Sequence, residues 1–165
     1  MNRRPVFALA LLLLSLITNT LHAQAKFAIY GTGGGEKSGI VNEGWTTAAT
    51  FGFYYGLYHV GPVALSADAR ADVSSNIKSG LIGPRVAFHI PAVPLKPYAE
   101  ALIGGSTYPT LPNGLTIPNK LTGRIVGGID TTILPHIDWR MIDYSYGLNK
   151  GEHTQTITSG LVLRF

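Results

Sequence analysis

The sequence predicts an all-β fold, an eight-stranded antiparallel up-and-down transmembrane β-barrel. Three observations favour this fold. Apolar and polar residues alternate with a period of two over most of the chain. Charged residues make up only 13% of the sequence, about half of the roughly 25% that is usual in soluble domains. The chain ends on an aromatic residue, Phe165, at the close of an alternating stretch, as the last strand of a membrane barrel does.

The first 25 residues have the features of a secretory signal peptide, which leaves residues 26–165 as one barrel domain. Arg3 and Arg4 form a basic start, residues 6–17 are apolar, and residues 23–25 have the small-x-small pattern of a cleavage site. The apolar stretch is too short to span a bilayer as a helix. We therefore expect export by the Sec route, with cleavage after Ala23 or Ala25.

Eight later segments alternate with a period of two, and each is a predicted strand. They are, in chain order, residues 26–32, 46–59, 63–73, 79–90, 96–106, 121–134, 137–148 and 154–165. The first two carry large apolar side chains at alternate positions. The third has the clearest pattern, because Asp68, Arg70 and Asp72 share one side while Val, Leu and Ala occupy the other. A helix would scatter these three charges around its circumference.

The remaining predicted strands follow the same rule, with one exception. The fourth, fifth and sixth each place a charged residue opposite an aliphatic side, at Arg85, Glu100 and Arg124. The seventh changes parity midway, so that Trp139 and Tyr144 share the outward side although they are five positions apart. A β-bulge near residues 141–142 would explain this change. The eighth alternates regularly to the end of the chain.

The connections predict which way the barrel is oriented. Those after the second, fourth and sixth strands are short and contain proline. Those after the first, third, fifth and seventh are mostly longer and polar or glycine-rich, and they comprise residues 33–44, 74–78, 107–120 and 149–153. Outer-membrane barrels have short turns on the periplasmic side and longer loops outside. We therefore expect both termini on the periplasmic side.

The C-terminal strand carries a candidate assembly signal. A polar residue, a glycine, a hydrophobic residue and a terminal aromatic residue follow one another at Thr158, Gly160, Leu163 and Phe165. In a membrane barrel the terminal ring lies in the aromatic girdle at the lipid–water boundary. The pattern resembles the C-terminal signal that the outer-membrane barrel assembly machinery reads. This machinery and outer-membrane lipids are the partners that we expect.

Four segments, 97–105, 126–130, 138–146 and 160–165, together resemble the small outer-membrane β-barrel family. Its members are eight-stranded domains of the porin superfamily, akin to the membrane domain of outer-membrane protein A. The resemblance is one of pattern over residues 26–165, and none of its motifs is specific to one activity. It implies the outer membrane of a diderm, Gram-negative-type bacterium. We expect the chain to be the barrel alone, without the peptidoglycan-binding domain of larger relatives.

Ten charged residues face the side opposite the apolar one and form the predicted lumen ion-pair network. They are Asp68, Arg70, Asp72, Arg85, Glu100, Arg124, Asp130, Asp138, Arg140 and Arg164. In a lumen as narrow as that of an eight-stranded barrel these groups cannot all reach bulk water, so they must pair. Paired charges would plug the lumen. We expect a structural or surface-interaction role, and the alternative is a narrow channel for ions or small solutes.

Other motifs point to no ligand. Residues 31–38 differ from a phosphate-binding loop by Glu36 in place of its last glycine, and no helix follows, so we expect an external loop there. The five histidines lack metal-ligand spacing, and cysteine is absent. The formal net charge of +4 includes no basic cluster. We therefore expect no cofactor, metal site or nucleic-acid partner.

Some eight-stranded barrels are lipid-modifying enzymes, such as the outer-membrane lipid A deacylases and palmitoyltransferases. The deacylases resemble serine hydrolases with a lipid-facing histidine and a serine two positions apart. The only similar place, His153, is followed two positions later by Gln155. We therefore expect no enzymatic activity. A soluble exported barrel of the lipocalin type is also disfavoured, because a narrow lumen would not bury so many charges as a ligand pocket.

Overall fold

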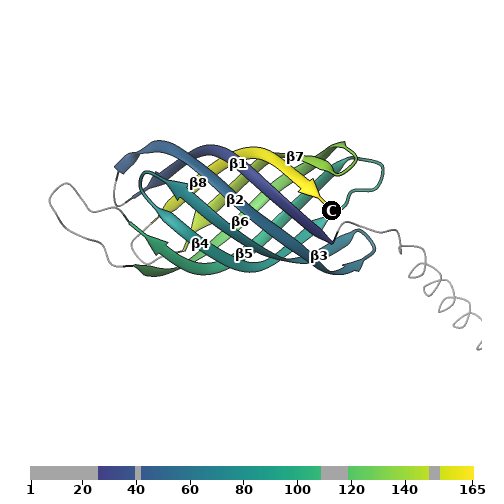
Figure 1. Cartoon of the computed structure of the whole chain (residues 1–165), viewed down its shortest axis with the longest axis horizontal. Coiled ribbons are helices and arrows are strands. Elements are labelled where there is room, and N and C mark those ends of the chain that lie inside the picture. The colour runs from purple at the N-terminus through teal and green to yellow at the C-terminus, as the bar shows by residue number, and fades with distance from the viewer. Residues whose placement is uncertain (1–25, 40–41, 109–118, 149–152) are drawn as a thin grey trace, which may run out of the picture.

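The computed structural model describes residues 26–39, 42–108, 119–148 and 153–165, and the predicted signal peptide lies outside them. Eight strands close one antiparallel barrel in chain order (Figure 1). They are β1 (Phe27–Ser38), β2 (Asn42–Val60), β3 (Val63–Ser74), β4 (Lys78–Phe88), β5 (Leu95–Thr107), β6 (Lys120–Leu134), β7 (Ile137–Gly147) and β8 (Thr154–Arg164). Because β8 pairs with β1, the sheet has no free edge. The predicted all-β, eight-stranded up-and-down barrel is confirmed.

Side chains alternate between the lumen and the outer surface along the strands. In β3, Val63 and Val73 are exposed, whereas Asp68 and Asp72 are buried, as the alternation predicted. Most of the large Phe, Ile and Leu side chains of the barrel are on the exposed side. A soluble protein has the reverse distribution, with apolar residues inside and charges outside. No helix in the described part of the chain is long and apolar enough to cross a bilayer.

The first strand is longer than the sequence predicted. The glycine-rich stretch 33–38 was expected to be an external loop, but it continues β1 and pairs with both β2 and β8. A side chain at Gly34 would overlap the backbone of Ile157, so glycine allows the close approach of β8 here. Because glycines have no side chains to alternate, the sequence predicted a loop here, although the backbone hydrogen bonds are those of a strand. The connection to β2 is reduced to residues 39–41.

The predicted bulge in the seventh strand is confirmed. The β7–β8 register shifts between Arg140 and Asp143, and both Met141 and Ile142 point outward. The extra residue brings Asp143 back to the lumen side of β7, where it is 2% exposed. The β2–β3 pairing has a second shift, between Gly56 and Tyr58, which the sequence did not predict.

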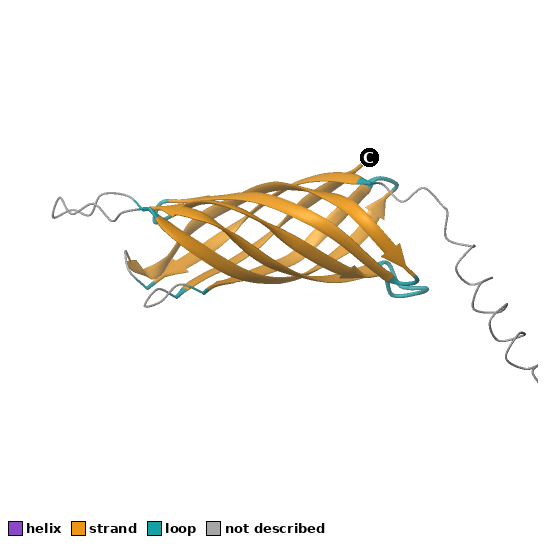
Figure 2. Cartoon of the chain, turned by 90° about the horizontal axis from the view of Figure 1, so that it is seen from below, coloured by secondary structure: helices purple, strands orange, loops and turns teal. Residues whose placement is uncertain are grey.

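The two ends of the barrel differ, and we call them the turn end and the loop end. The turn end holds residues 61–62, 89–94 and 135–136, together with the start of β1 and the end of β8 (Figures 1 and 2). Backbone hydrogen bonds between Phe27 and Phe165 join the two termini of the sheet there. The loop end holds the other four connections. Two of these, 39–41 and 75–77, are as short as the turns, so the predicted alternation of lengths is wrong for them.

Candidate functional site: the polar interior of the barrel

All ten charges of the predicted lumen network point into the barrel, and each lies in at least one ion pair. Nine are buried, and Arg164 is half-buried at the turn end. Some pairs join strands that are not neighbours in the sheet, such as Arg70 with Asp143 and Asp72 with Arg124, because inward side chains share one narrow space. They form three groups along the barrel: one in the middle and one near each end.

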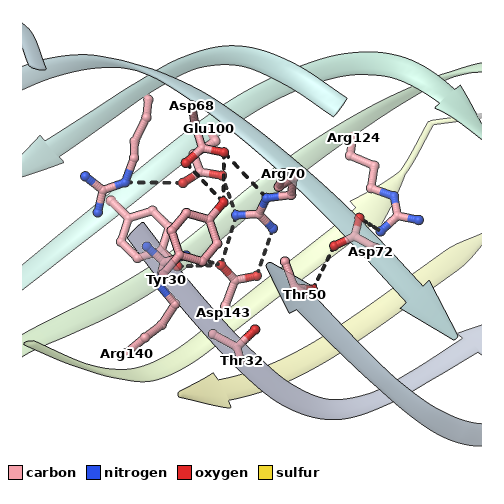
Figure 3. A network of polar contacts seen from close by, with 12 residues as sticks. Tyr30, Thr32, Thr50, Asp68, Arg70, Asp72, Glu100, Arg124, Arg140 and Asp143 are labelled. Carbon is pink, nitrogen blue, oxygen red and sulfur yellow. Dashed lines mark hydrogen bonds and ion pairs between the residues drawn. The ribbon is translucent and has the colours of Figure 1, made fainter. Parts of the chain in front are cut away.

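The middle group, which we call the central cluster, combines three kinds of side chain. It contains three arginines, four carboxylates and three tyrosines: Arg70, Arg85, Arg140, Asp68, Glu100, Asp130, Asp143, Tyr30, Tyr54 and Tyr98. Each is 9% exposed or less, and Arg140 has no exposure at all. Figure 3 shows how several of them converge from different strands. An open pore would leave its lining accessible to solvent, whereas these side chains are almost inaccessible.

Arg70 is the branching point of the cluster. Its Nη2 lies 2.6 Å from Glu100 Oε2 and 3.1 Å from Asp143 Oδ2 (Figure 3). Asp68, two residues earlier on β3, is farther away, with 3.8 Å between its Oδ1 and Arg70 Nε. Hydrogen bonds between charged partners are the strong ones in such an interior, so Arg70 ties β3 firmly to β5 and β7.

Arg85 and Arg140 share a carboxylate. Asp130 Oδ2 lies 2.9 Å from Arg85 Nη2, and its Oδ1 lies 3.0 Å from Arg140 Nε. Arg85 also contacts Glu100, at 3.2 Å, and Arg140 also contacts Asp143, at 3.3 Å. The arginines and carboxylates therefore form one continuous network over β3 to β7, in which every arginine has at least two acidic neighbours.

The tyrosine rings stack with the guanidinium groups. Arg85 lies 4.2 Å from the centre of the Tyr54 ring and 4.3 Å from that of Tyr98. Arg140 lies 4.1 Å from the centre of the Tyr30 ring and 4.7 Å from that of the Tyr98 ring. A desolvated cation–π contact contributes about 2 kcal/mol, so this stack adds to the ion pairs. Its rings also fill the space in the lumen that the paired charges alone would leave empty.

Two inward glycines make room for the rings. Gly52 on β2 is the direct cross-strand partner of Tyr30, and Gly128 on β6 is that of Tyr98. A Cβ atom at either glycine would overlap the phenol group of the tyrosine. Each tyrosine therefore lies flat across the neighbouring strand, which directs its ring to the arginines and its hydroxyl to a carboxylate. Tyr98 donates a 2.6 Å hydrogen bond to Asp143.

Smaller polar groups lie on both sides of the central cluster. Towards the loop end, Asp72 pairs with Arg124 at 2.8 Å and accepts hydrogen bonds from Thr50 and Ser79. At the same end, Glu36 accepts a 2.6 Å hydrogen bond from Ser74.

At the turn end, Asp138 lies 2.8 Å from Lys96 Nζ and 3.0 Å from Arg164 Nη2. The group towards the loop end has one more negative than positive charge, and the group at the turn end has one more positive than negative charge. Both groups lie closer to the openings of the barrel than the central cluster does.

Several members of the interior were not among the predicted site residues. They are Asp143, Lys96, Glu36, Tyr30, Tyr54 and Tyr98. Inward parity was visible for most of them in the sequence. Asp143 follows the bulge, where the parity changes, and the tyrosines carry no charge, so a network defined by charged residues leaves them out. A glycine opposite a tyrosine on the next strand is the signal that would have found Tyr30 and Tyr98.

The residues of the predicted assembly signal have two orientations. Thr158 points into the lumen, where its hydroxyl accepts a hydrogen bond from Thr32. Leu163 and Phe165 are exposed, and the Phe165 ring packs 6.2 Å from that of Phe27. Gly160 pairs with Arg140 of β7 and Thr32 of β1. This strand closes the barrel, and its role as a signal stays a prediction.

The histidines are outside the central cluster. His59 and His89 lie near the turn end with their ring centres 6.0 Å apart, and His153 Nδ1 lies 2.7 Å from Tyr146 Oη at the loop end. Among the residues that the structure describes, no group of three or more potential ligands could hold a metal ion.

No model of a known protein family matches the sequence, and no curated protein matches it. Solved structures do match. Neisserial surface protein A is 14% identical with a TM-score of 0.60, over 87% of this chain and 100% of that one. The N-terminal β-barrel domain of Pseudomonas aeruginosa OprF is 12% identical with a TM-score of 0.56, over 87% and 100%. The outer-membrane enzyme PagL is 12% identical with a TM-score of 0.53, over 83% and 99%.

These likenesses show the fold, which is that of small eight-stranded outer-membrane barrels. The predicted resemblance is therefore confirmed at the level of the fold. The matched proteins include both an enzyme and proteins of other kinds, so the shared fold does not by itself define what this chain does.

Proposed function

We propose that the protein is an integral β-barrel of the bacterial outer membrane, with a sealed lumen and a structural or surface-interaction role. The distribution of charge supports the membrane location. All seven carboxylates whose side chains are described are buried in the interior. The surface around the middle of the strands is formed by side chains such as Phe53, Ala69, Ile103 and Ile142. Such a surface suits the hydrocarbon core of a bilayer.

The turn end would then face the periplasm and the loop end the outside. Exposed aromatic residues gather at the turn end, including Phe27, Tyr58, Phe88 and Phe165. Near the loop end, Trp45 is 53% exposed, and Lys37 lies beside it in the β1–β2 register. Aromatic rings and lysines at both limits of an apolar belt are typical of membrane–water interfaces.

The central cluster is the observation that carries the sealed lumen. Its arginine and carboxylate side chains are 4% exposed or less, so no continuous wet passage runs beside them. Planar-bilayer recording of the purified protein tests this. We expect little steady conductance in the wild type. A large, stable open state would overturn the sealed barrel and favour the alternative of a narrow channel.

Location is tested separately. Membrane fractionation should recover the protein with the outer membrane, and the unboiled sample should migrate differently from the boiled one on a gel, since an intact barrel stays compact. Recovery as a soluble protein, or identical migration of both samples, would contradict the proposal. We expect outer-membrane lipids and the barrel assembly machinery to be the partners.

We further propose that the protein has no catalytic role. The likeness to PagL is one of fold, and His153 Nδ1 lies 2.7 Å from the hydroxyl of Tyr146. Gln155, two positions after His153, pairs with Tyr146 across the β7–β8 ladder. Mass spectrometry of outer-membrane lipids from cells with and without the protein tests this, and a loss or gain of an acyl chain would contradict it.

A further inference from the structure

The central cluster contains unequal numbers of acidic and basic groups. Its four carboxylates meet only three guanidinium groups, and all seven side chains are nearly inaccessible to solvent. With every group ionised the cluster would carry a net charge of −1. A buried charge without a counter-charge keeps its full desolvation penalty, so the cluster must bind one more positive charge.

The contacts identify the carboxylate that receives no hydrogen bond from an arginine. Asp130 receives hydrogen bonds from two arginines, and Asp143 from two arginines and Tyr98. Glu100 Oε2 accepts a 2.6 Å hydrogen bond from Arg70, and its Oε1 lies 3.2 Å from Arg85 Nε without a hydrogen bond among the described residues. Asp68 differs from all three. Its only guanidinium neighbour within 4 Å is Arg70 Nε, at 3.8 Å, which is beyond hydrogen-bond distance.

We propose that the central cluster is a binding site for one proton, and that Asp68 holds it. Within the described ranges, the one side chain that hydrogen-bonds to Asp68 is Tyr30, whose hydroxyl lies 2.9 and 3.1 Å from the two carboxyl oxygens. A neutral phenol suits a neutral carboxylic acid as well as it suits a carboxylate. With Asp68 neutral, three carboxylates remain for three guanidinium groups. A metal cation would instead need several oxygen ligands around it.

The surroundings of Asp68 contain groups of both signs. On its own strand lie Arg70 and Asp72, and the neighbouring strands contribute Tyr54 from β2 and Arg85 from β4. The other members of the central cluster come from β1, β5, β6 and β7, and they are Tyr30, Tyr98, Glu100, Asp130, Arg140 and Asp143. Beside the cluster, β8 presents the uncharged Thr156 and Thr158, and its charged inward residue, Arg164, lies at the turn end against Asp138. The three arginines already have closer acidic partners, so none of them is available to neutralise Asp68.

Infrared difference spectroscopy of the folded full chain at neutral pH tests the proposal, because a protonated carboxyl group has a stretching band distinct from that of a carboxylate. The measurement uses the Glu36→Gln background, because Glu36 is a buried carboxyl outside the ion pairs described above and its Oε2 has no hydrogen-bond partner among the described residues. We expect a protonated-carboxyl band that disappears on adding Asp68→Asn and persists on adding Asp72→Asn. Absence of the band, or its survival in the Asp68→Asn variant, would overturn the proposal.

A second measurement needs no infrared band. In urea unfolding, Asp68→Asn should have a midpoint equal to or above that of the wild type, because the amide replaces an already neutral group. Asp143→Asn should have a lower midpoint, because it removes a charge that Arg70 and Arg140 contact. Equal losses in both variants would contradict the assignment.

Replacing sodium chloride by choline chloride should leave the urea midpoint of the wild type unchanged. A midpoint that rises only with sodium would show that the extra cation is sodium.

Discussion

Arg140 joins two carboxylates and two tyrosine rings from a position with no solvent exposure. Replacing it by alanine leaves Asp130 and Asp143 each with one arginine fewer. We expect Arg140→Ala to lower the free energy of unfolding by about 3–5 kcal/mol. Urea titration in detergent micelles or vesicles measures this. Arg164→Ala is the control, since the Arg164 side chain is 26% exposed and its pair with Asp138 should contribute at most about 1 kcal/mol. Equal losses would mean that water reaches the middle of the lumen.

Neighbouring glycines provide a sharper test of the tyrosine stack. A methyl group at Gly128 would overlap Tyr98, whereas one at Gly127 would meet nothing within 4 Å. We expect Gly128→Ala to cost about 1–3 kcal/mol by displacing the ring. Gly127→Ala, on the outward side, should change stability by less than about 0.5 kcal/mol. Urea unfolding of both variants compares them, and similar values would show that the ring does not depend on its glycine partner.

At the scale of the strands, side-chain alternation predicted every element and most of its bounds. It failed for residues 33–38, because a glycine-rich run has no alternation of apolar and polar side chains. The backbone pairing of this run with β2 and β8 makes it part of a strand. It succeeded even at the bulge of β7, since a change of parity is itself a pattern. The same alternation decides which residues of the interior were predictable. Asp68, Arg70 and Asp72 were predictable from parity on one strand, whereas the contacts of Asp143 depend on how seven other strands are placed.

The facing of β3 has a direct consequence in a bilayer. Ala69 lies in the middle of the strand on the outward side, and Val73 lies on the same side near the loop end. We expect Ala69→Arg to cost about 2–4 kcal/mol, because it places a charge near the bilayer midplane. Val73→Arg should cost about 0–1 kcal/mol, because the charge can reach the interface. Refolding titrations into vesicles measure both, and equal costs would contradict the proposed membrane position of the strand.

The C-terminal strand allows assembly and anchoring to be separated. We expect Phe165→Asp to abolish the assembly signal, so that the protein accumulates in the periplasm and is degraded. Phe88→Asp is the matched control, because Phe88 is also an exposed aromatic residue at the turn end but lies on β4. It should still reach the outer membrane. Quantitative fractionation compares the two, and normal outer-membrane levels of Phe165→Asp would show that this terminus is not a targeting element.

At the scale of the whole molecule, the barrel depends on its interior as much as a soluble protein depends on its core. In the proposed membrane location lipid would surround the apolar side chains, so the contacts that distinguish one arrangement of strands from another are polar and lie inside. The network links β3 to β7, and the stack adds Tyr30 and Tyr54 from β1 and β2. The sequence could predict which charges face inward, but not which pairs form, because pairing depends on the stagger of the closed sheet.

If the stack seals the lumen, removing two adjacent members should open it. Tyr98 on β5 and Arg140 on β7 lie 4.7 Å apart in the stack. The double variant Tyr98→Ala, Arg140→Ala removes both the ring and the cation, and water should fill the vacated space because Asp130 and Asp143, each with one arginine fewer, attract it. We expect discrete channel openings in planar bilayers that the wild type lacks.

The matched control is Ile103→Ala, Ile142→Ala, which shortens two outward side chains on the same two strands and should stay closed. Recordings are made on protein that keeps its heat-modifiable migration, so that misfolded chains are excluded. A folded double variant that stays closed would place the seal elsewhere, at the ion pairs near the two ends of the barrel.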